Sequence, residues 1–142
     1  RWCISFALAA LTATPALAAG QEGPDDGTSV GEREYAAHCA VCHGPEGKGD
    51  GPMAGKLSKP VPDLTVLQEA NDGVFPFDRV YRIIEGEEPV DFHGTRQMPV
   101  WGPAYRVEAQ IMYAPFWPFD PEAFVRGRIL ALTTYVHTLQ AR

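Results

Sequence analysis

The apolar residues near the C-terminus repeat at the period of an α-helix. Positions three or four residues apart carry the large aliphatic side chains, namely Val125, Ile129, Leu132, Val136 and Leu139. Asp120 can serve as the N-cap, Pro121 suits the first helical position, and Glu122 adds a negative charge to the first turn. The pattern therefore predicts a long helix from Pro121 to about Gln140 with one apolar face.

Two shorter helices are predicted earlier in the chain. Ser29 and Glu32 form a capping-box pattern, so a first helix should run from residue 30 to residue 39 or 40. A second should run from residue 77 or 78 to Glu85, because its apolar residues lie at helical spacing and Gly86 follows as a stop signal.

The region between these two helices is rich in glycine and proline. Five glycines fall within the twelve residues after His43, and Pro60, Pro62 and Pro76 follow. A glycine-rich loop can cradle a phosphate, but here no predicted strand precedes the loop and no Gly-Lys-[Ser/Thr] sequence follows. We therefore expect irregular loop, with Leu64, Val66 and Leu67 available to pack against a bound group.

The first 19 residues resemble a secretory signal peptide. Arg1 precedes an apolar stretch that ends in Ala16-Leu17-Ala18, a small-residue pattern suited to signal peptidase. This stretch is shorter than the roughly 20 residues that span a bilayer, so we expect cleavage rather than an uncleaved anchor. Residues 20–28 should form a flexible lead-in, and residues 29–142 a periplasmic domain without stable membrane insertion.

The chain is acidic. It contains 12 basic and 18 acidic residues, a formal charge of −6, and removal of Arg1 leaves 11 minus 18, or −7. Because nucleic acids are also negatively charged, this composition argues against a nucleic-acid partner.

The sequence feature with the most specific chemistry is the run Cys39-Ala40-Val41-Cys42-His43. Two thiols one helical turn apart can add to the two vinyl groups of a haem, while the adjacent imidazole reaches the iron from the same side. Cys3 falls in the segment expected to be removed, so only the Cys39 and Cys42 pair remains. This count excludes a multi-disulfide scaffold and a four-cysteine zinc site.

A bare C-x-x-C pair has three other uses: a disulfide, a thioredoxin-like dithiol and half of a zinc site. Thioredoxin chemistry needs a βαβ context, whereas a predicted helix precedes this pair and a glycine-rich loop follows it. His43 comes directly after the second cysteine. Covalent haem attachment is therefore favoured over these alternatives.

With this motif, the sequence resembles the class I c-type cytochromes. The resemblance implies an all-α, cytochrome c-like fold of three to five helices wrapped around one covalently bound haem c per chain, with thioether bonds to Cys39 and Cys42. It extends over most of residues 29–142.

The resemblance also implies a specific helix crossing. In this family, a small residue eight positions before the first motif cysteine and an aromatic residue four positions before it let the N-terminal helix cross closely against the C-terminal helix. Gly31 and Tyr35 occupy these positions. We expect them to meet Leu132 and Tyr135 of the last predicted helix.

The resemblance identifies His43 and Met98 as the iron ligands. Pro99 pushes Met98 out of the helical region, and 98 minus 43 leaves 55 residues, enough to pass around a haem. By the same resemblance, the carbonyl of Pro52 accepts the imidazole N–H of His43. An open sixth position remains possible, as do the other candidate ligands Met53, Met112, His38, His93 and His137.

Residues 104–120 depart from the simplest class I pattern, in which the last helix follows the methionine loop more directly. This insert contains aromatic residues and prolines at high density: Tyr105, Tyr113, Pro115, Phe116, Trp117, Pro118 and Phe119. We expect an ordered lobe whose rings pack onto the core and shield one haem edge, rather than a surface for docking a partner. Trp101, just before it, should be a packing residue.

These observations favour a non-enzymatic function. We expect a periplasmic carrier of single electrons, with a redox partner protein that presents a basic docking patch to the acidic surface. A dedicated haem subunit of a periplasmic dehydrogenase or oxidase complex is an alternative. A haem-based gas sensor or peroxidase is a further alternative, but the sequence has no convincing distal acid or base near the ligand loop.

Overall fold

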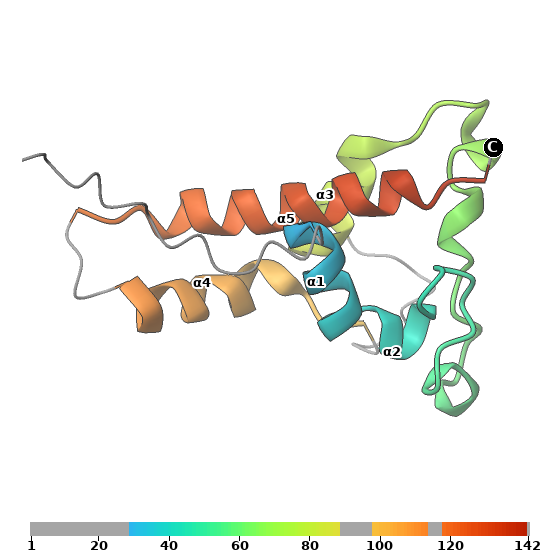
Figure 1. Ribbon diagram of the computed structural model, residues 1–142, viewed down its shortest axis with the longest axis horizontal. Coiled ribbons are helices and arrows are strands. Elements are labelled where there is room, and N and C mark those ends of the chain that lie inside the picture. Colours follow the sequence, from blue (N-terminus) through green and yellow to red (C-terminus); the bar gives the residue numbers. More distant parts are fainter. Residues whose placement is uncertain (1–28, 89–97, 114–117, 142) are drawn as a thin grey trace, which may run out of the picture.

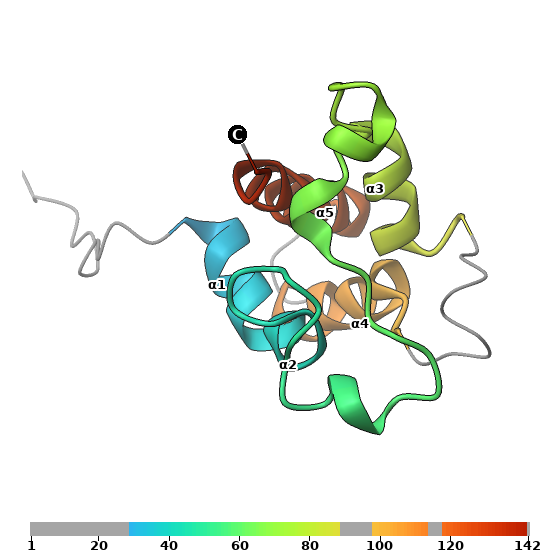
Figure 2. The ribbon, with the colours of Figure 1, turned by 90° about the vertical axis from the view of Figure 1, so that its right-hand side faces the viewer.

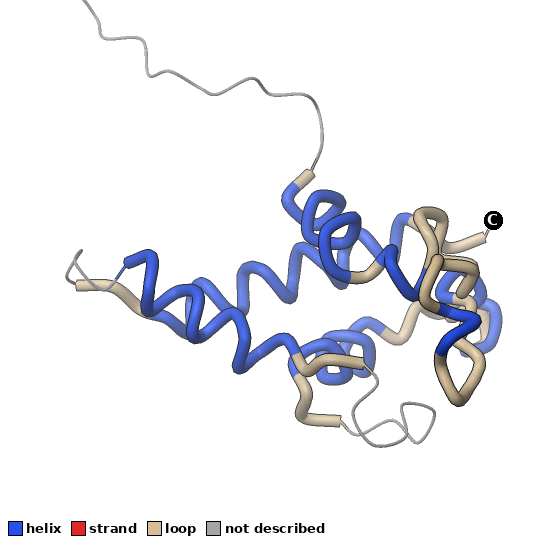
Figure 3. The backbone as a smooth tube through the Cα atoms, turned by 90° about the horizontal axis from the view of Figure 1, so that it is seen from below, coloured by secondary structure: helices blue, strands red, loops and turns tan. Residues whose placement is uncertain are grey.

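The computed structural model describes residues 29–88, 98–113 and 118–141, and this part of the chain consists of helices and loops without strands (Figure 3). The predicted all-α fold is therefore confirmed. Three short 3₁₀ turns lie at Ala54–Lys56, Leu64–Val66 and Glu69–Asn71. The α-helices are α1 (Val30–His38), α2 (Ala40–His43), α3 (Phe77–Glu85), α4 (Trp101–Tyr113) and α5 (Pro121–Thr138).

Helix α5 is the central element and packs against α1, α3 and α4 (Figures 1 and 2). It begins as predicted, because the side chain of Asp120 accepts a hydrogen bond of 2.9 Å from the Glu122 amide and Pro121 occupies the first turn. The helix ends at Thr138, slightly before the predicted end. Its buried residues follow the predicted apolar face: Val125, Ile129, Leu132, Thr133 and Val136.

Helices α1 and α5 cross in close contact. The side chain of Ser29 caps α1 by accepting a 3.1 Å hydrogen bond from the Glu32 amide. At the crossing, a Cβ atom at Gly31 would lie 2.9 Å from the Cβ of Tyr135. The rings of Tyr35 and Tyr135 lie 5.1 Å apart. The predicted crossing is confirmed.

Helix α3 also forms as predicted. It ends at Glu85, and Gly86 follows with a φ of 104°, a left-handed conformation that glycine adopts without the steric cost of a side chain. Val80 and Ile84 are buried on its inner side.

Most residues of the predicted aromatic insert, 104–120, belong to helix α4. It begins at Trp101 and runs antiparallel beside α5, so the two form a hairpin that extends away from α2 (Figure 1). Near the far end of the hairpin, the ring of Tyr113 stacks on Phe119 at 4.6 Å. Phe116 and Trp117 lie outside the described residues.

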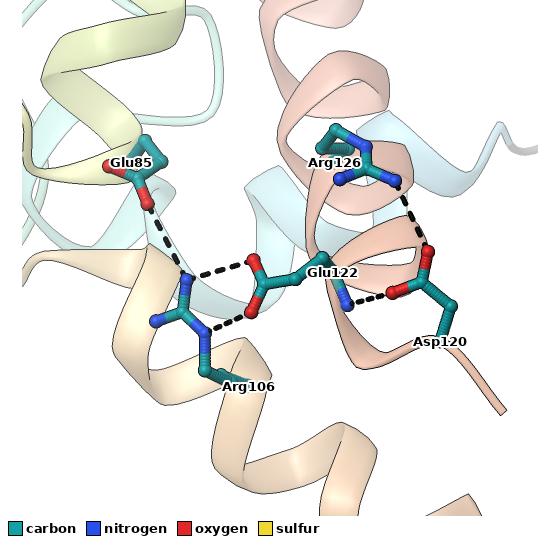
Figure 4. A network of polar contacts seen from close by, with 5 residues as sticks. All are labelled: Glu85, Arg106, Asp120, Glu122 and Arg126. Carbon is teal, nitrogen blue, oxygen red and sulfur yellow. Dashed lines mark hydrogen bonds and ion pairs between the residues drawn. The ribbon is translucent and has the colours of Figure 1, made fainter.

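A polar network on the surface connects α3, α4 and α5 (Figure 4). Arg106 of α4 donates from Nε and Nη2 to the two carboxylate oxygens of Glu122, at 2.5 and 3.0 Å, and its Nη2 lies 3.9 Å from Oε1 of Glu85 on α3. Asp120 pairs with Arg126 at 3.4 Å. Exposed ion pairs each contribute little free energy, so this network orients the helices more than it stabilises the fold.

Candidate functional site

The cysteine motif lies at the junction between α1 and α2. Cys39 separates the two helices, so the predicted first helix ends one or two residues early, at His38. The amide of His43 donates a 2.9 Å hydrogen bond to the Cys39 carbonyl, which closes one helical turn around the motif. Cys39 and Cys42 are free thiols, and His43 is buried.

The loop after the motif folds back onto α2 and fixes its position. The amides of Gly49, Gly51 and Met53 donate to the carbonyls of His43, Cys42 and Val41, at 2.8, 3.1 and 2.9 Å respectively.

Gly51 and Tyr35 hold this loop from two sides. A Cβ atom on Gly51 would lie 2.6 Å from the carbonyl oxygens of Ala40 and Val41, so only glycine fits so close to α2. The Tyr35 hydroxyl donates a 2.8 Å hydrogen bond to the carbonyl of Gly44. The orientation of the motif is thus set by backbone bonds and by α1.

A cavity with two lobes opens beside the motif. Four residues line both lobes: Cys39, His43, Pro62 and Met98. The larger lobe covers about 780 Å³, with the space open to solvent included, and is almost entirely apolar, lined also by Tyr35, Leu64, Leu67, Val80, Ile83, Ile84, Leu132 and Val136. The smaller lobe, about 500 Å³ on the same measure, adds Cys42 and a wall formed by His38, Leu57, Lys59, Pro60, Val61, Pro99 and Trp101.

The residues that line this cavity suit a haem. The apolar lobe suits a macrocycle, the two thiols lie on the cavity wall where thioether bonds would form, and an imidazole and a thioether are available as axial ligands. The residues present therefore match the cofactor that the motif implies.

The protonation state of Cys39 argues against thiolate chemistry. Burial raises the pKa of the Cys39 thiol to about 12, and the neighbouring Cys42 adds to this increase. A catalytic dithiol needs a lowered pKa, because the thiolate is the reactive form. The environment of Cys39 thus disfavours the thioredoxin-like alternative.

Among the predicted methionine candidates, only Met98 lines the cavity. Met53 and Met112 are exposed and belong to neither lobe. The side chain of His137 stacks on Phe75 at 4.5 Å and lines neither lobe. His93 lies outside the described residues.

Two predictions about the surroundings of the site stay open. Of the rings in the insert, Tyr105 is buried in the core as predicted, whereas Tyr113 and Phe119 line neither lobe. The shielding of one haem edge by this insert therefore stays a prediction. Pro52 is exposed and lines neither lobe, whereas Pro62 lines both. The role of the Pro52 carbonyl stays a prediction, and Pro62 is the proline on the cavity wall.

The sequence named His38 only as a candidate ligand and Trp101 only as a packing residue, and it did not predict that the two form one wall of the cavity. Their rings lie 4.5 Å apart, and both line the smaller lobe. His38 also lies 3.6 Å from the carboxylate of Glu34, which accepts a 2.8 Å hydrogen bond from Tyr105 and pairs with Arg128. The spacing of Glu34 and His38, one helical turn apart on α1, was the one available signal.

Comparison with known proteins agrees with this site. The family model for cytochrome c matches residues 29–114, a segment that begins at the N-cap of α1 and contains the motif and Met98. No curated protein and no solved structure matches the chain. None of the helices in the described part of the chain is long and apolar enough to cross a membrane. Proteins of this family carry covalently attached haem c and transfer electrons through it. Cys39 and Cys42 fit this attachment, and the chain belongs to the cytochrome c family.

Proposed function

We propose that this chain is a periplasmic carrier of single electrons, with His43 and Met98 as the axial ligands of its haem iron. One observation carries the proposal: the imidazole and the thioether line the same cavity as the two motif cysteines. When bound, haem c supplies an iron that takes up and releases one electron.

His43 supplies the ligand that is fixed in advance. Its ring is buried, and its backbone is bonded on one side to Cys39 and on the other to Gly49. A ligand held in this way does not need to rearrange when the charge on the iron changes. Little rearrangement between oxidation states favours fast electron transfer.

Met98 and the apolar lobe are both expected to raise the reduction potential of the haem. A thioether is a soft, neutral ligand that favours Fe(II). The aliphatic side chains of α3 and α5 exclude water and disfavour the additional charge of Fe(III). Both effects would raise the reduction potential, and an iron held by His43 and Met98 would have no position left for a substrate.

The proposed location and partner rest on the sequence. Residues 1–19 have the pattern of an export signal, and the net charge of −6 favours a partner with a basic docking patch. A dedicated haem subunit of an oxidoreductase complex would use the same site but would remain bound to that complex during purification.

A redox titration of the purified protein, followed in the visible spectrum, tests the function. We expect the spectrum of a c-type haem, a single one-electron transition, and no binding of carbon monoxide to the reduced wild type. Rapid binding of carbon monoxide would contradict ligation by Met98 and favour the gas-sensor or peroxidase alternative. Absence of the haem c spectrum would reject the proposal entirely.

A further inference from the structure

The end of the chain is bonded to one wall of the haem cavity. Gln140 follows α5, and its side-chain Nε2 donates to the carbonyls of Leu64 and Val136 at 2.7 and 2.9 Å. Its Oε1 accepts a 2.9 Å hydrogen bond from the amide of Gln68. One carboxamide thus connects α5 to two points of a segment more than 70 residues earlier in the chain.

The segment between these two points contributes directly to the cavity. Leu64 and Leu67 both line the apolar lobe. Apart from the single 3₁₀ turn Leu64–Val66, the segment has no regular structure of its own up to Gln68, and such short turns have weak hydrogen-bond geometry. Its position therefore depends on bonds to other parts of the molecule.

Three contacts supply that support. The Leu64 amide donates to the Gly47 carbonyl at 2.6 Å, which ties the segment to the loop after the motif. The Ala141 amide donates to the Thr65 carbonyl at 2.8 Å. Gln140 is the side chain that satisfies both ends of the segment, because a carboxamide carries donors and an acceptor together.

We propose that Gln140 is a positioning residue of the haem cavity. It holds the Leu64–Gln68 wall against the bound macrocycle and so limits the access of water to it. Since exposure of a haem to water favours the oxidised form, this clamp contributes to a high reduction potential. The inference rests on the proposed function, in that it requires haem in this cavity.

The variant Gln140→Asn tests the clamp without a change of charge. Asparagine keeps the carboxamide but is one methylene shorter, so it cannot reach both Leu64 and Gln68 from α5. Gln110→Asn on the exposed side of α4 is the matched control. Gln140→Met, which removes the carboxamide at similar length, is the second variant in case one of them does not fold.

Two measurements on the haem-loaded variants test whether Gln140 positions the Leu64–Gln68 wall. Hydrogen exchange at the Gln68 amide should become about 2- to 10-fold faster in Gln140→Asn, as expected for the loss of one hydrogen bond. The midpoint potential should fall below that of the wild type. Gln110→Asn should change neither.

The inference is overturned if the melting temperature falls while the potential and the Gln68 exchange rate stay at wild-type values. In that case Gln140 has only a structural role. The inference is also overturned if the melting temperature, the midpoint potential and the Gln68 exchange rate of Gln140→Asn all equal those of the wild type. Failure of the proposed function is distinguishable, because it would appear in the wild type as a missing haem c spectrum or a missing one-electron transition.

Discussion

Gly31 of α1 lies directly against the backbone of Ala131 on α5. A Cβ atom at position 31 would fall 2.7 Å from the carbonyl carbon of Ala131. The lack of a side chain lets the two helices approach closely enough for Tyr35 to be buried and for Leu132 to reach the apolar lobe. This contact therefore shapes the cavity as well as the helix pair.

Gly31→Val should destabilise the protein. Overpacking a tight contact typically costs about 1 to 3 kcal/mol, and here the neighbour is backbone that cannot move aside. The control is Gly127→Ala on the open side of α5, where a Cβ meets nothing within 4 Å. It should stabilise the helix by about 0.5 to 1 kcal/mol. Thermal unfolding measures both effects, and an unchanged melting temperature for Gly31→Val would contradict the crossing.

Glu34→Gln should also reduce stability. The carboxylate of Glu34 is buried, accepts a 2.8 Å hydrogen bond from Tyr105 and pairs with Arg128. The amide removes the nearer counter-charge of the Arg128 guanidinium and leaves it only Glu108, at 3.5 Å. The loss of a buried hydrogen bond to a charged group costs about 1.5 to 3 kcal/mol. Urea unfolding should show this loss in Glu34→Gln and little change in Glu122→Gln, which alters an exposed pair. Equal effects of the two substitutions would refute the distinction between them.

Stability should fall with rising pH above about pH 10, partly because of Tyr35. Burial raises the pKa of Tyr35, with smaller contributions from Cys39, Tyr135 and Asp50. In the unfolded chain the phenol ionises near its ordinary pKa of about 10, but in the folded protein it stays protonated. The folded state therefore holds more protons above pH 10, and its stability decreases by up to about 1.4 kcal/mol per pH unit for this group.

Tyr35→Phe provides the check on this pH dependence. The variant should be less stable at pH 8, because the 2.8 Å hydrogen bond to Gly44 is lost. Between pH 10 and pH 11, however, its unfolding free energy should decrease less steeply than that of the wild type. Urea unfolding across this range gives both values, and parallel curves would show that Tyr35 does not contribute.

The helices that could be predicted are those with local signals at their ends. Ser29 and Asp120 cap α1 and α5, and Gly86 terminates α3. Each of these residues acts within one turn of its own helix, so the signal is present in the local sequence. The motif from Cys39 to His43 could be identified from the sequence in the same way, because its chemistry depends on the spacing of its residues.

Helix α4 could not be predicted in the same way. Its first turn contains Gly102 and Pro103, which suggest a turn, but the first amides of a helix need no intrahelical acceptor. Gly102 is required by packing, since a Cβ there would lie 2.7 Å from the Glu85 carbonyl oxygen. Val107 and Ile111 point to solvent, so no apolar face marked the helix.

The prolines near the site illustrate a second limit. The local sequences around Pro52 and Pro62 do not indicate which of the two reaches the cavity, because the path of the loop decides this. That path depends on the hydrogen bond between Leu64 and Gly47, a tertiary contact. The set of residues on the smaller lobe, including His38 and Trp101, depends on tertiary contacts in the same way.

The acidic charge predicts how the proposed partner is recognised. If the partner presents a basic patch, the bimolecular rate of electron transfer should fall steeply as ionic strength rises, because the screening length is only about 8 Å at 0.15 M salt. Stopped-flow measurements across a salt series give this dependence. A rate that is flat in salt and reduced by Trp117→Ala would instead favour apolar docking and the dedicated-subunit alternative.

The number of covalent bonds to the haem can be counted. Cys39 and Cys42 should each form one thioether, so Cys42→Ser should retain at most one. Mass spectrometry of the intact protein and the pyridine haemochrome spectrum report the bonds separately from folding. Two intact thioethers in Cys42→Ser would mean that another thiol takes part.

The central claim is that His43 and Met98 together hold the iron, and the near-infrared spectrum of the oxidised protein tests it most directly. A methionine sulfur bound to ferric haem gives a weak charge-transfer band there. The wild type and the control Met53→Ala should both show this band, whereas Met98→Ala should lack it and should bind carbon monoxide when reduced. A band that persists in Met98→Ala and disappears in Met53→Ala would contradict the claim and move the ligand to Met53.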